Sequence, residues 1–252
     1  MAAHGASAGL ILRFVYPRSS SATHRRLMRW WSGKLLRILN VVPEVRGHSP
    51  VDSPAAFMIA ANHVSWLDIF VVSSVRPARF IAKSEIRDWP AVGWIVEKAG
   101  TLFVRRGGRR DLARITERAQ AALAEGDCVG LFPEGTTTEG DRLLKFHSSL
   151  FEPATANGAR ILPAAIRYEH EDGSLCRAAS FAGEVSFMQS LGLIVRQRRI
   201  VARLTYGEPI DPAGIGRRDV ARIAQERVAT LLGLAPEGMA PGRVADRGDE
   251  PR

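Results

Sequence analysis

Residues 57–68 have the sequence FMIAANHVSWLD, from Phe57 to Asp68. The first five are apolar and predict a short buried strand that ends at Asn62 and His63. A helix is expected to begin directly afterwards, with the hydroxyl of Ser65 as its N-cap and Asp68 three residues later. The segment places one imidazole at the carboxyl end of a strand, beside a helix N-terminus and a carboxylate. That arrangement suits a general base.

The same residues also have a purely structural explanation. Ser65 and Asp68 fit a capping box, which needs no catalytic partner. In a chain with six histidines, a histidine followed five positions later by an aspartate arises easily by accident. This stretch alone leaves both explanations open.

Short apolar segments alternate with helical patterns along the chain. The strand at residues 128–132 is wholly apolar, which indicates burial on both faces between helices. The alternation predicts an α/β protein with a largely parallel central sheet flanked by helices. Strands are predicted at residues 57–61, 79–83, 100–106, 128–132, 161–166 and 200–206, and helices at residues 65–74, 111–124, 149–157 and 218–232.

The composition is that of a soluble or peripheral globular protein. Hydrophobic residues make up 46% of the 252 residues, which is enough for the core of one large domain. The sequence contains no run of eighteen apolar residues, so no membrane-spanning helix is predicted. Residues 1–50 contain eight arginines and lysines but one acidic residue, so they carry most of the net charge of +9. This favours an anionic partner, either lipid headgroups or nucleic acid, over a merely solvated face.

A basic amphipathic helix is predicted at residues 24–42 and is expected to end at Pro43. Trp30 and Trp31 add rings of the kind favoured at membrane interfaces. An ordinary helix packed on the core would show the same period. We favour the interpretation that this helix lies on a membrane surface.

Polar groups follow three of the predicted strands. They are His63 with Asp68, Arg106, and Glu134. Because the carboxyl ends of parallel strands meet at one edge of a sheet, these groups are expected to face one crevice. A base, a cation and a hydrogen-bonding carboxylate suit acyl transfer to a hydroxyl that lies near an anionic group.

Four sequence blocks resemble those of the glycerolipid acyltransferases of the lysophosphatidic acid acyltransferase (PlsC) type. Their order and spacing match over roughly residues 50 to 210, and the first and third blocks are the most specific. The blocks are Asn62-His63-x-x-x-x-Asp68, Gly100-x-x-Phe103-Val104-x-Arg106, Phe132-Pro133-Glu134-Gly135-Thr136 and Leu162-Pro163-Ala164.

The resemblance implies a mechanism without a bound cofactor or metal. His63 would deprotonate the hydroxyl of a lysolipid, which attacks an acyl thioester of coenzyme A or acyl carrier protein as co-substrate. Asp68 would orient the imidazole and stabilise the imidazolium. The residues implied to bind the acceptor are Asn62, Arg106, Glu134, Gly135 and Thr136.

Two departures from the family pattern leave the acceptor open. Phosphatidic acid enzymes of the family usually have arginine after Glu-Gly-Thr, whereas this chain has Thr137, whose hydroxyl cannot replace a bidentate phosphate contact. Phe146-His147-Ser148-Ser149 stands where those enzymes tend to carry F-K-x-G. Both departures look more like the lyso-ornithine lipid acyltransferase branch, whose acceptor carboxylate Arg106 or Lys145 would meet. Lysophosphatidate and lyso-ornithine lipid stay near parity.

Together these features predict a basic membrane-associated segment at residues 1–50, an acyltransferase domain at residues 51–233 and a disordered tail at residues 234–252. The expected place is the cytoplasmic face of the inner membrane, as a peripheral or monotopic protein, and the two cysteines fit a reducing compartment. Expected partners are an anionic lipid surface, the lysolipid and the thioester carrier, with no nucleic acid. A non-catalytic basic protein that binds membrane or nucleic acid, and a thioester hydrolase, remain alternatives.

Overall fold

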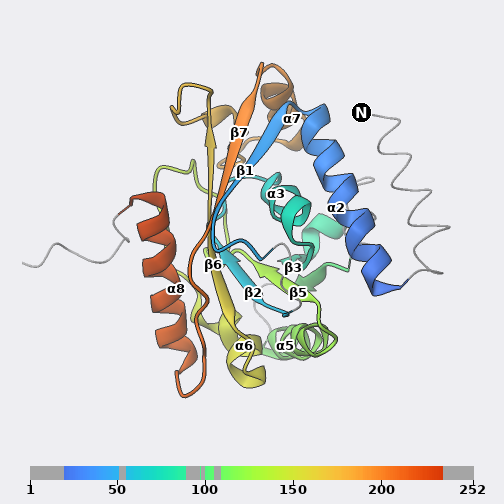
Figure 1. Ribbon diagram of the computed structural model, residues 1–252, viewed down its shortest axis with the longest axis vertical. Coiled ribbons are helices and arrows are strands. Elements are labelled where there is room, and N and C mark those ends of the chain that lie inside the picture. The colour runs from blue at the N-terminus through green and yellow to red at the C-terminus, as the bar shows by residue number, and fades with distance from the viewer. Residues whose placement is uncertain (1–19, 51–54, 89–96, 98–99, 105–108, 235–252) are drawn as a thin grey trace, which may run out of the picture.

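A seven-stranded sheet crosses the centre of the computed structural model, which describes residues 20–50, 55–88, 97, 100–104 and 109–234 (Figure 1). Its strands are β1 (Val41–Gly47), β2 (Met58–Ala61), β3 (Ala78–Lys83), β4 (Leu102–Val104), β5 (Cys128–Leu131), β6 (Ile161–Glu169) and β7 (Ile200–Tyr206). The strand order is β1-β7-β6-β2-β5-β3-β4. Five of the six neighbouring pairs are parallel, and β6 and β7 are antiparallel. The predicted largely parallel sheet is therefore confirmed.

Helices cover both faces of this sheet, as the sequence predicts. One layer contains α2 (Ser21–Ile38), α3 (Asp68–Val75) and α7 (Phe187–Val195), and the other contains α5 (Arg109–Ala124), α6 (Glu152–Asn157) and α8 (Arg217–Leu232) (Figure 1). Three short 3-10 turns, Ser84–Asp88, Ser148–Phe151 and Arg177–Ala179, complete the described elements.

Strand β2 lies in the middle of the sheet and is buried on both faces. Met58 and Ala60 pack into the cluster under α5, α6 and α8, whereas Ile59 and Ala61 pack into the cluster under α2, α3 and α7. A strand with both faces buried has an apolar residue at every position, which explains the sequence of residues 58–61. Asn62 and His63 therefore directly follow a strand that is held in the interior of the fold.

The neighbouring strand β5 depends on a glycine. A Cβ atom at Gly130 would lie 2.5 Å from the ring of Phe80, so no larger residue fits beneath that ring. Phe80 in turn stacks on Phe132, directly after β5, with 5.5 Å between ring centroids. This stack positions Phe132 at the carboxyl edge of the sheet.

The N-terminal helix ends earlier than predicted. α2 stops at Ile38, and Asn40 turns the chain with a positive φ of 56°, a conformation that asparagine tolerates better than most residues. Pro43 does not end the helix but lies inside β1. Among the strands that the structure describes, β1 pairs only with β7 and lies at the edge of the sheet. Proline is tolerated at an edge because it removes no obligatory ladder bond.

The packing of α2 also differs from the prediction. Trp31 is buried, with its ring 5.7 Å from that of Phe70 in α3, and Leu35 is buried in the same cluster. At Trp31 and Leu35, the apolar stripe expected to face a membrane therefore packs in the core, as the competing explanation holds. Trp30 remains 50% exposed, with the ammonium of Lys34 above its ring.

Candidate active site

His63 follows β2 directly, and its ring is held on two sides. Nδ1 lies 2.8 Å from Oδ2 of Asp68, and the ring stacks on Phe132 with 4.0 Å between centroids and 6° between planes. The side chain is 22% exposed. The imidazole is thus fixed in direction while part of it stays open to a ligand.

Asp68 is fully buried and receives four hydrogen bonds. Oδ2 accepts from His63 Nδ1 and from the backbone amides of Val64 (2.8 Å) and Ser65 (3.0 Å), and Oδ1 accepts from the hydroxyl of Tyr168 (2.7 Å). These partners donate, which matches an ionised carboxylate. The Asp68 bond assigns the proton of the neutral imidazole to Nδ1 and leaves the Nε2 lone pair available.

Tyr168 lies in β6, 100 residues from Asp68 in the sequence. Burial raises the pKa of Tyr168 well above its ordinary value, and the charge of Asp68 and the hydrogen bond to it raise this pKa further. The hydroxyl therefore keeps its proton and acts only as a donor to Asp68. No motif in the sequence indicates this contact, because β6 and α3 meet only through the fold.

Ser65 does not cap the helix, contrary to the prediction. α3 begins at Asp68 without a side-chain cap, and the Ser65 hydroxyl is buried with no hydrogen-bond partner in the described part of the chain. The physical reason is that the Asp68 amide, which a Ser65 cap would bind, donates to the Ser65 carbonyl at 3.1 Å instead. The Asp68 carboxylate meanwhile accepts from the amides of Val64 and Ser65. The turn is therefore organised around the carboxylate that holds His63.

The loop after β5 grips the backbone of His63. Glu134 is 4% exposed; its Oε1 accepts from the His63 amide at 2.7 Å and its Oε2 from the Leu144 amide at 2.9 Å. The amide of Thr138 donates to the His63 carbonyl at 2.9 Å. The first and third sequence blocks are thus joined at His63, whose amide and carbonyl both bind the same loop.

Asn62 has a structural position. Its Nδ2 donates to the carbonyl of Ile166 at 2.9 Å, and its Oδ1 accepts from the Ile166 amide at 2.7 Å. The residue is only 1% exposed. The expectation that Asn62 binds the acceptor is therefore corrected, because its amide extends the pairing of β2 with β6.

The remaining predicted residues lie around the same loop or outside the described chain. Gly135 has a φ of 70°, and a Cβ atom there would lie 3.3 Å from the His147 ring. Thr136 is exposed. Thr137 donates its hydroxyl proton to the carbonyl of Phe181. Arg106 lies outside the described residues.

The geometry thus combines an oriented imidazole, a buried carboxylate and a loop that fixes both. A family model described as "Acyltransferase" matches residues 20–167, more than half of the chain. The chain belongs to the acyltransferase family.

Relatives of this acyltransferase act on two kinds of lysolipid, according to their names. The lyso-ornithine lipid O-acyltransferase of Pseudomonas aeruginosa is 37% identical over 229 residues, which cover 90% of this chain and 87% of the relative. The 1-acyl-sn-glycerol-3-phosphate acyltransferase of Neisseria meningitidis is 39% identical over 172 residues, covering 68% and 67%.

A solved structure shares the fold. The crystal structure of the 1-acyl-sn-glycerophosphate acyltransferase PlsC from Thermotoga maritima superposes with a TM-score of 0.65, covering 89% of this chain and 87% of that one, at 22% identity. The predicted fold class, family and enzyme class are confirmed. Within the described residues, no cluster of three or more histidine, cysteine or acidic side chains has the arrangement of a metal site.

Proposed function

We propose that His63 is the general base of this acyltransferase and Asp68 the residue that orients it. The observation that carries the proposal is the 2.8 Å bond from His63 Nδ1 to a carboxylate that three further donors hold in place. A positioned base of this kind contributes roughly 10²–10⁴-fold in rate. Asp68 stabilises the imidazolium when the proton arrives.

The reaction needs two proton transfers, one from the acceptor hydroxyl to His63 and one from His63 to the leaving sulfur. His63 Nε2 takes the proton of the acceptor hydroxyl as its oxygen attacks the thioester carbonyl. The tetrahedral intermediate then collapses, the carbon–sulfur bond breaks, and the departing sulfur receives the proton from the imidazolium. The products are an ester and a free thiol of coenzyme A or acyl carrier protein.

Lyso-ornithine lipid is the acceptor that we propose. The relative with that name aligns over 90% of this chain. The position after Glu-Gly-Thr offers no guanidinium, and the Thr137 hydroxyl gives its proton to the carbonyl of Phe181, so it is not a donor to a phosphate. Arg177 near this loop is paired with both Glu139 and Asp141 at 3.0 Å, which reduces its attraction for a phosphate dianion.

Lysophosphatidate is the second candidate, favoured by the 39% identity to the Neisseria meningitidis enzyme. For either acceptor, we propose that Arg106 meets the anionic headgroup and that Gly135 and Thr136 line its site. Glu134 acts through His63 as a positioning residue, because both of its oxygens bind backbone amides.

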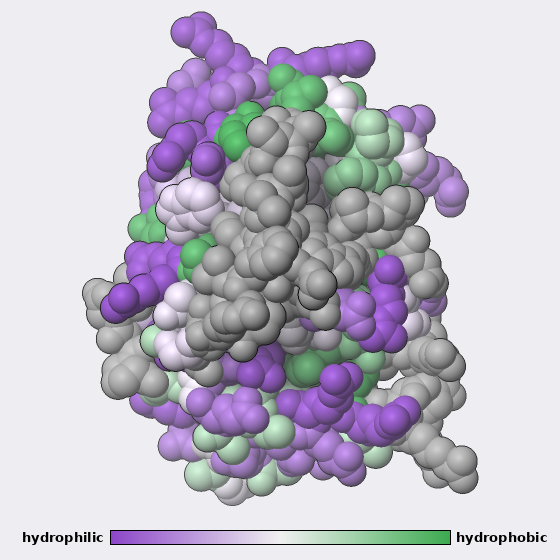
Figure 2. All heavy atoms as spheres, turned by 90° about the vertical axis from the view of Figure 1, so that its right-hand side faces the viewer, coloured by the Kyte–Doolittle hydropathy of each residue, from purple (hydrophilic) through white to green (hydrophobic). Residues whose placement is uncertain are grey.

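We also propose that the enzyme works at an anionic membrane surface on the cytoplasmic side. No helix among the described residues is long and apolar enough to cross a bilayer. Figure 2 shows hydrophobic surface near the upper end of the side that carries α2, at the height of α7 in Figure 1. The exposed apolar side chains on these two helices are Trp30, Ile38, Met188, Leu193 and Val195. Arginines on α2 and after α7 accompany them, a combination suited to a headgroup region.

A competition assay tests the chemistry and the acceptor together. The purified chain receives a labelled acyl thioester and vesicles that contain both lyso-ornithine lipid and lysophosphatidate, and mass spectrometry identifies the products. We expect diacylated ornithine lipid to dominate and the His63→Ala variant to lose it, while His48→Ala, which changes an exposed histidine, retains it. Transfer that survives His63→Ala would refute the base. Release of free fatty acid without any diacylated lipid would identify a hydrolase.

A further inference from the structure

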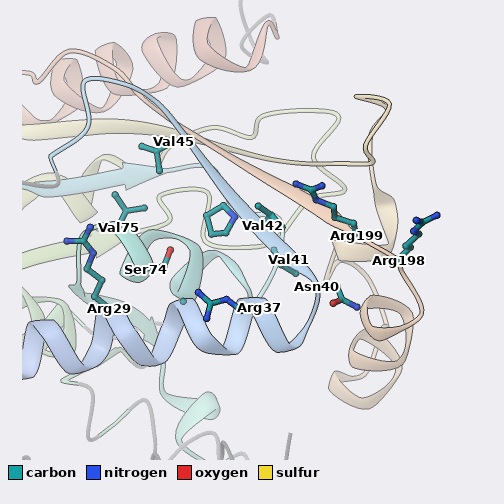
Figure 3. Close-up of a pocket in the computed structure, with 12 residues that line it drawn as sticks. Arg29, Arg37, Asn40, Val41, Val42, Val45, Ser74, Val75, Arg198 and Arg199 are labelled. Atoms are coloured by element: carbon teal, nitrogen blue, oxygen red, sulfur yellow. The ribbon is translucent and has the colours of Figure 1, made fainter.

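A groove separate from the catalytic pair lies between α2, the first half of β1 and the end of α3. Its volume is about 580 Å³, within the range of ligand pockets. Figure 3 shows Arg29 and Arg37 reaching from α2 toward β1 and the end of α3. Ser74 and Val75, which line the groove, are the last two residues of α3, whereas Asp68 is its first. Ser74 lies six positions after Asp68, which places the groove roughly 9 Å from Asp68 along the helix axis.

The groove carries net positive charge. Among the described residues that line it are four arginines and no acidic residue. Arg199 pairs with Glu171, but Arg29, Arg37 and Arg198 form no ion pair with any residue in the described ranges. The C-terminal end of α3 contributes about half a negative charge, which two guanidinium groups exceed.

The groove also has an apolar part on β1 and unfilled space beside α2. Val42 and Val45 of β1 line it and are 36% and 39% exposed. Arg29, Gly33 and Arg37 are spaced four residues apart and follow one face of α2. A Cβ atom at Gly33 would meet no atom within 4 Å, so the glycine leaves free space between the two arginines.

We propose that this groove binds the phosphate headgroup of an anionic membrane phospholipid. The guanidinium groups of Arg29 and Arg37 would hold the phosphate through bidentate hydrogen bonds, and the first part of the lipid chains would lie along Val42 and Val45. The site would orient the enzyme on the membrane. It rests on the proposed membrane association but not on the proposed chemistry or acceptor.

Two observations favour a lipid over an acidic carrier protein. The positive charge lines a concave site together with exposed valines, which suits an amphiphile with one anionic end. Trp30 follows Arg29 and is half-exposed beneath Lys34, an arrangement suited to the level of lipid headgroups.

The test is a calorimetric titration of the full chain with dioctanoyl phosphatidylglycerol, at lipid concentrations below the critical micelle concentration. We expect saturable binding of one lipid. Arg29→Ala/Arg37→Ala should weaken it by roughly 100-fold, because a hydrogen bond to a charged group contributes about ten-fold or more in affinity. Arg114→Ala/Arg118→Ala removes two exposed arginines one turn apart on α5, also without an ion pair to any described residue, and should bind like the parent chain.

A second pair of variants separates the groove from general attraction of opposite charges. Gly33→Leu fills the groove without changing the charge and should abolish binding, whereas Gly33→Ala adds only a methyl group in free space and should retain most of it. Binding that survives both Arg29→Ala/Arg37→Ala and Gly33→Leu would overturn the proposal. Equal affinity for dioctanoyl phosphatidylcholine would also overturn it. So would tighter binding of acyl carrier protein, coenzyme A or inorganic phosphate than of the lipid, seen as displacement of the lipid from the groove. His63→Ala should bind the lipid normally, so failure of the catalytic proposal would be distinguishable.

Discussion

Replacing Glu134 with glutamine distinguishes a carboxylate that holds His63 from one that binds the acceptor. The two oxygens of Glu134 accept from the amides of His63 and Leu144 at 2.7 and 2.9 Å in a site that is 4% exposed. Glutamine has one acceptor oxygen and one NH₂ group. One of the two buried amides would therefore face a second donor.

The cost follows from these two bonds. A hydrogen bond to a charged group contributes about 1.5–3 kcal/mol and a neutral one about 1 kcal/mol. Glu134→Gln exchanges two charge-assisted bonds for one neutral bond and leaves one buried N–H unsatisfied, so the free energy of unfolding should fall by roughly 2–5 kcal/mol. In a chain of this size, such a loss lowers Tm by about 10 °C. Because the His63 backbone loses its anchor, kcat should fall by up to about 10²-fold.

Denaturant unfolding and steady-state kinetics on vesicles measure the two effects. Glu139→Gln is the matched control, since Glu139 lies in the same loop but is exposed and should cost less than about 0.5 kcal/mol. In a His63→Ala background, Glu134→Gln should still lower stability but have no further effect on the rate. Unchanged stability with a raised KM for the acceptor would refute the positioning role and favour the headgroup contact predicted from the sequence.

Three further predictions concern Asp68 and the buried tyrosines. Asp68→Asn should lower kcat by about 10²–10⁴-fold in acyl-transfer assays, because an amide cannot stabilise the imidazolium; circular dichroism checks the fold, and full activity would contradict the role of Asp68. Tyr168→Phe should lower the free energy of unfolding by about 1.5–3 kcal/mol, because a buried charged group loses a donor, and equal stability of the two chains would be inconsistent with that bond. Tyr206→Phe is its control and should cost little, since the Tyr206 hydroxyl has no partner within the described chain. Burial raises the pKa of both tyrosines, so above about pH 10 they ionise only in the unfolded chain. The unfolded chain then binds fewer protons, and stability should fall by about 1.4 kcal/mol per pH unit for each tyrosine; urea unfolding at pH 9 to 11.5 measures this slope, which the double phenylalanine variant should flatten.

Several elements were predictable because their signals are local. The wholly apolar segments at residues 58–61 and 128–131 are continuous in the sequence. A continuous apolar segment of this length is enough to predict a strand that is buried on both faces. The contact of His63 with Asp68 was also predictable, since the turn formed by the four residues between them brings the two side chains together. The family blocks carry the same local information.

Other elements were not predictable from local patterns. β1 contains a proline and four exposed residues, so its pattern does not indicate a strand until β7 lies beside it. The membrane interpretation of α2 was misleading at Trp31, because a helix that packs on a core and one that lies on a membrane have the same period. Ser65 looked like a cap, but the Asp68 amide that its hydroxyl would bind donates to the Ser65 carbonyl instead.

The sequence by itself determined the fold class, the family and the proximity of His63 to Asp68, the pair proposed here as catalytic, because each rests on short-range spacing. Only the tertiary structure decided how that pair is held. Tyr168 reaches Asp68 from 100 residues away, and Glu134 reaches the His63 amide from 71 residues away. The groove between α2 and β1 likewise exists only once both elements pack against α3. Contacts between distant segments depend on the order of the strands in the sheet, and no local periodicity encodes that order.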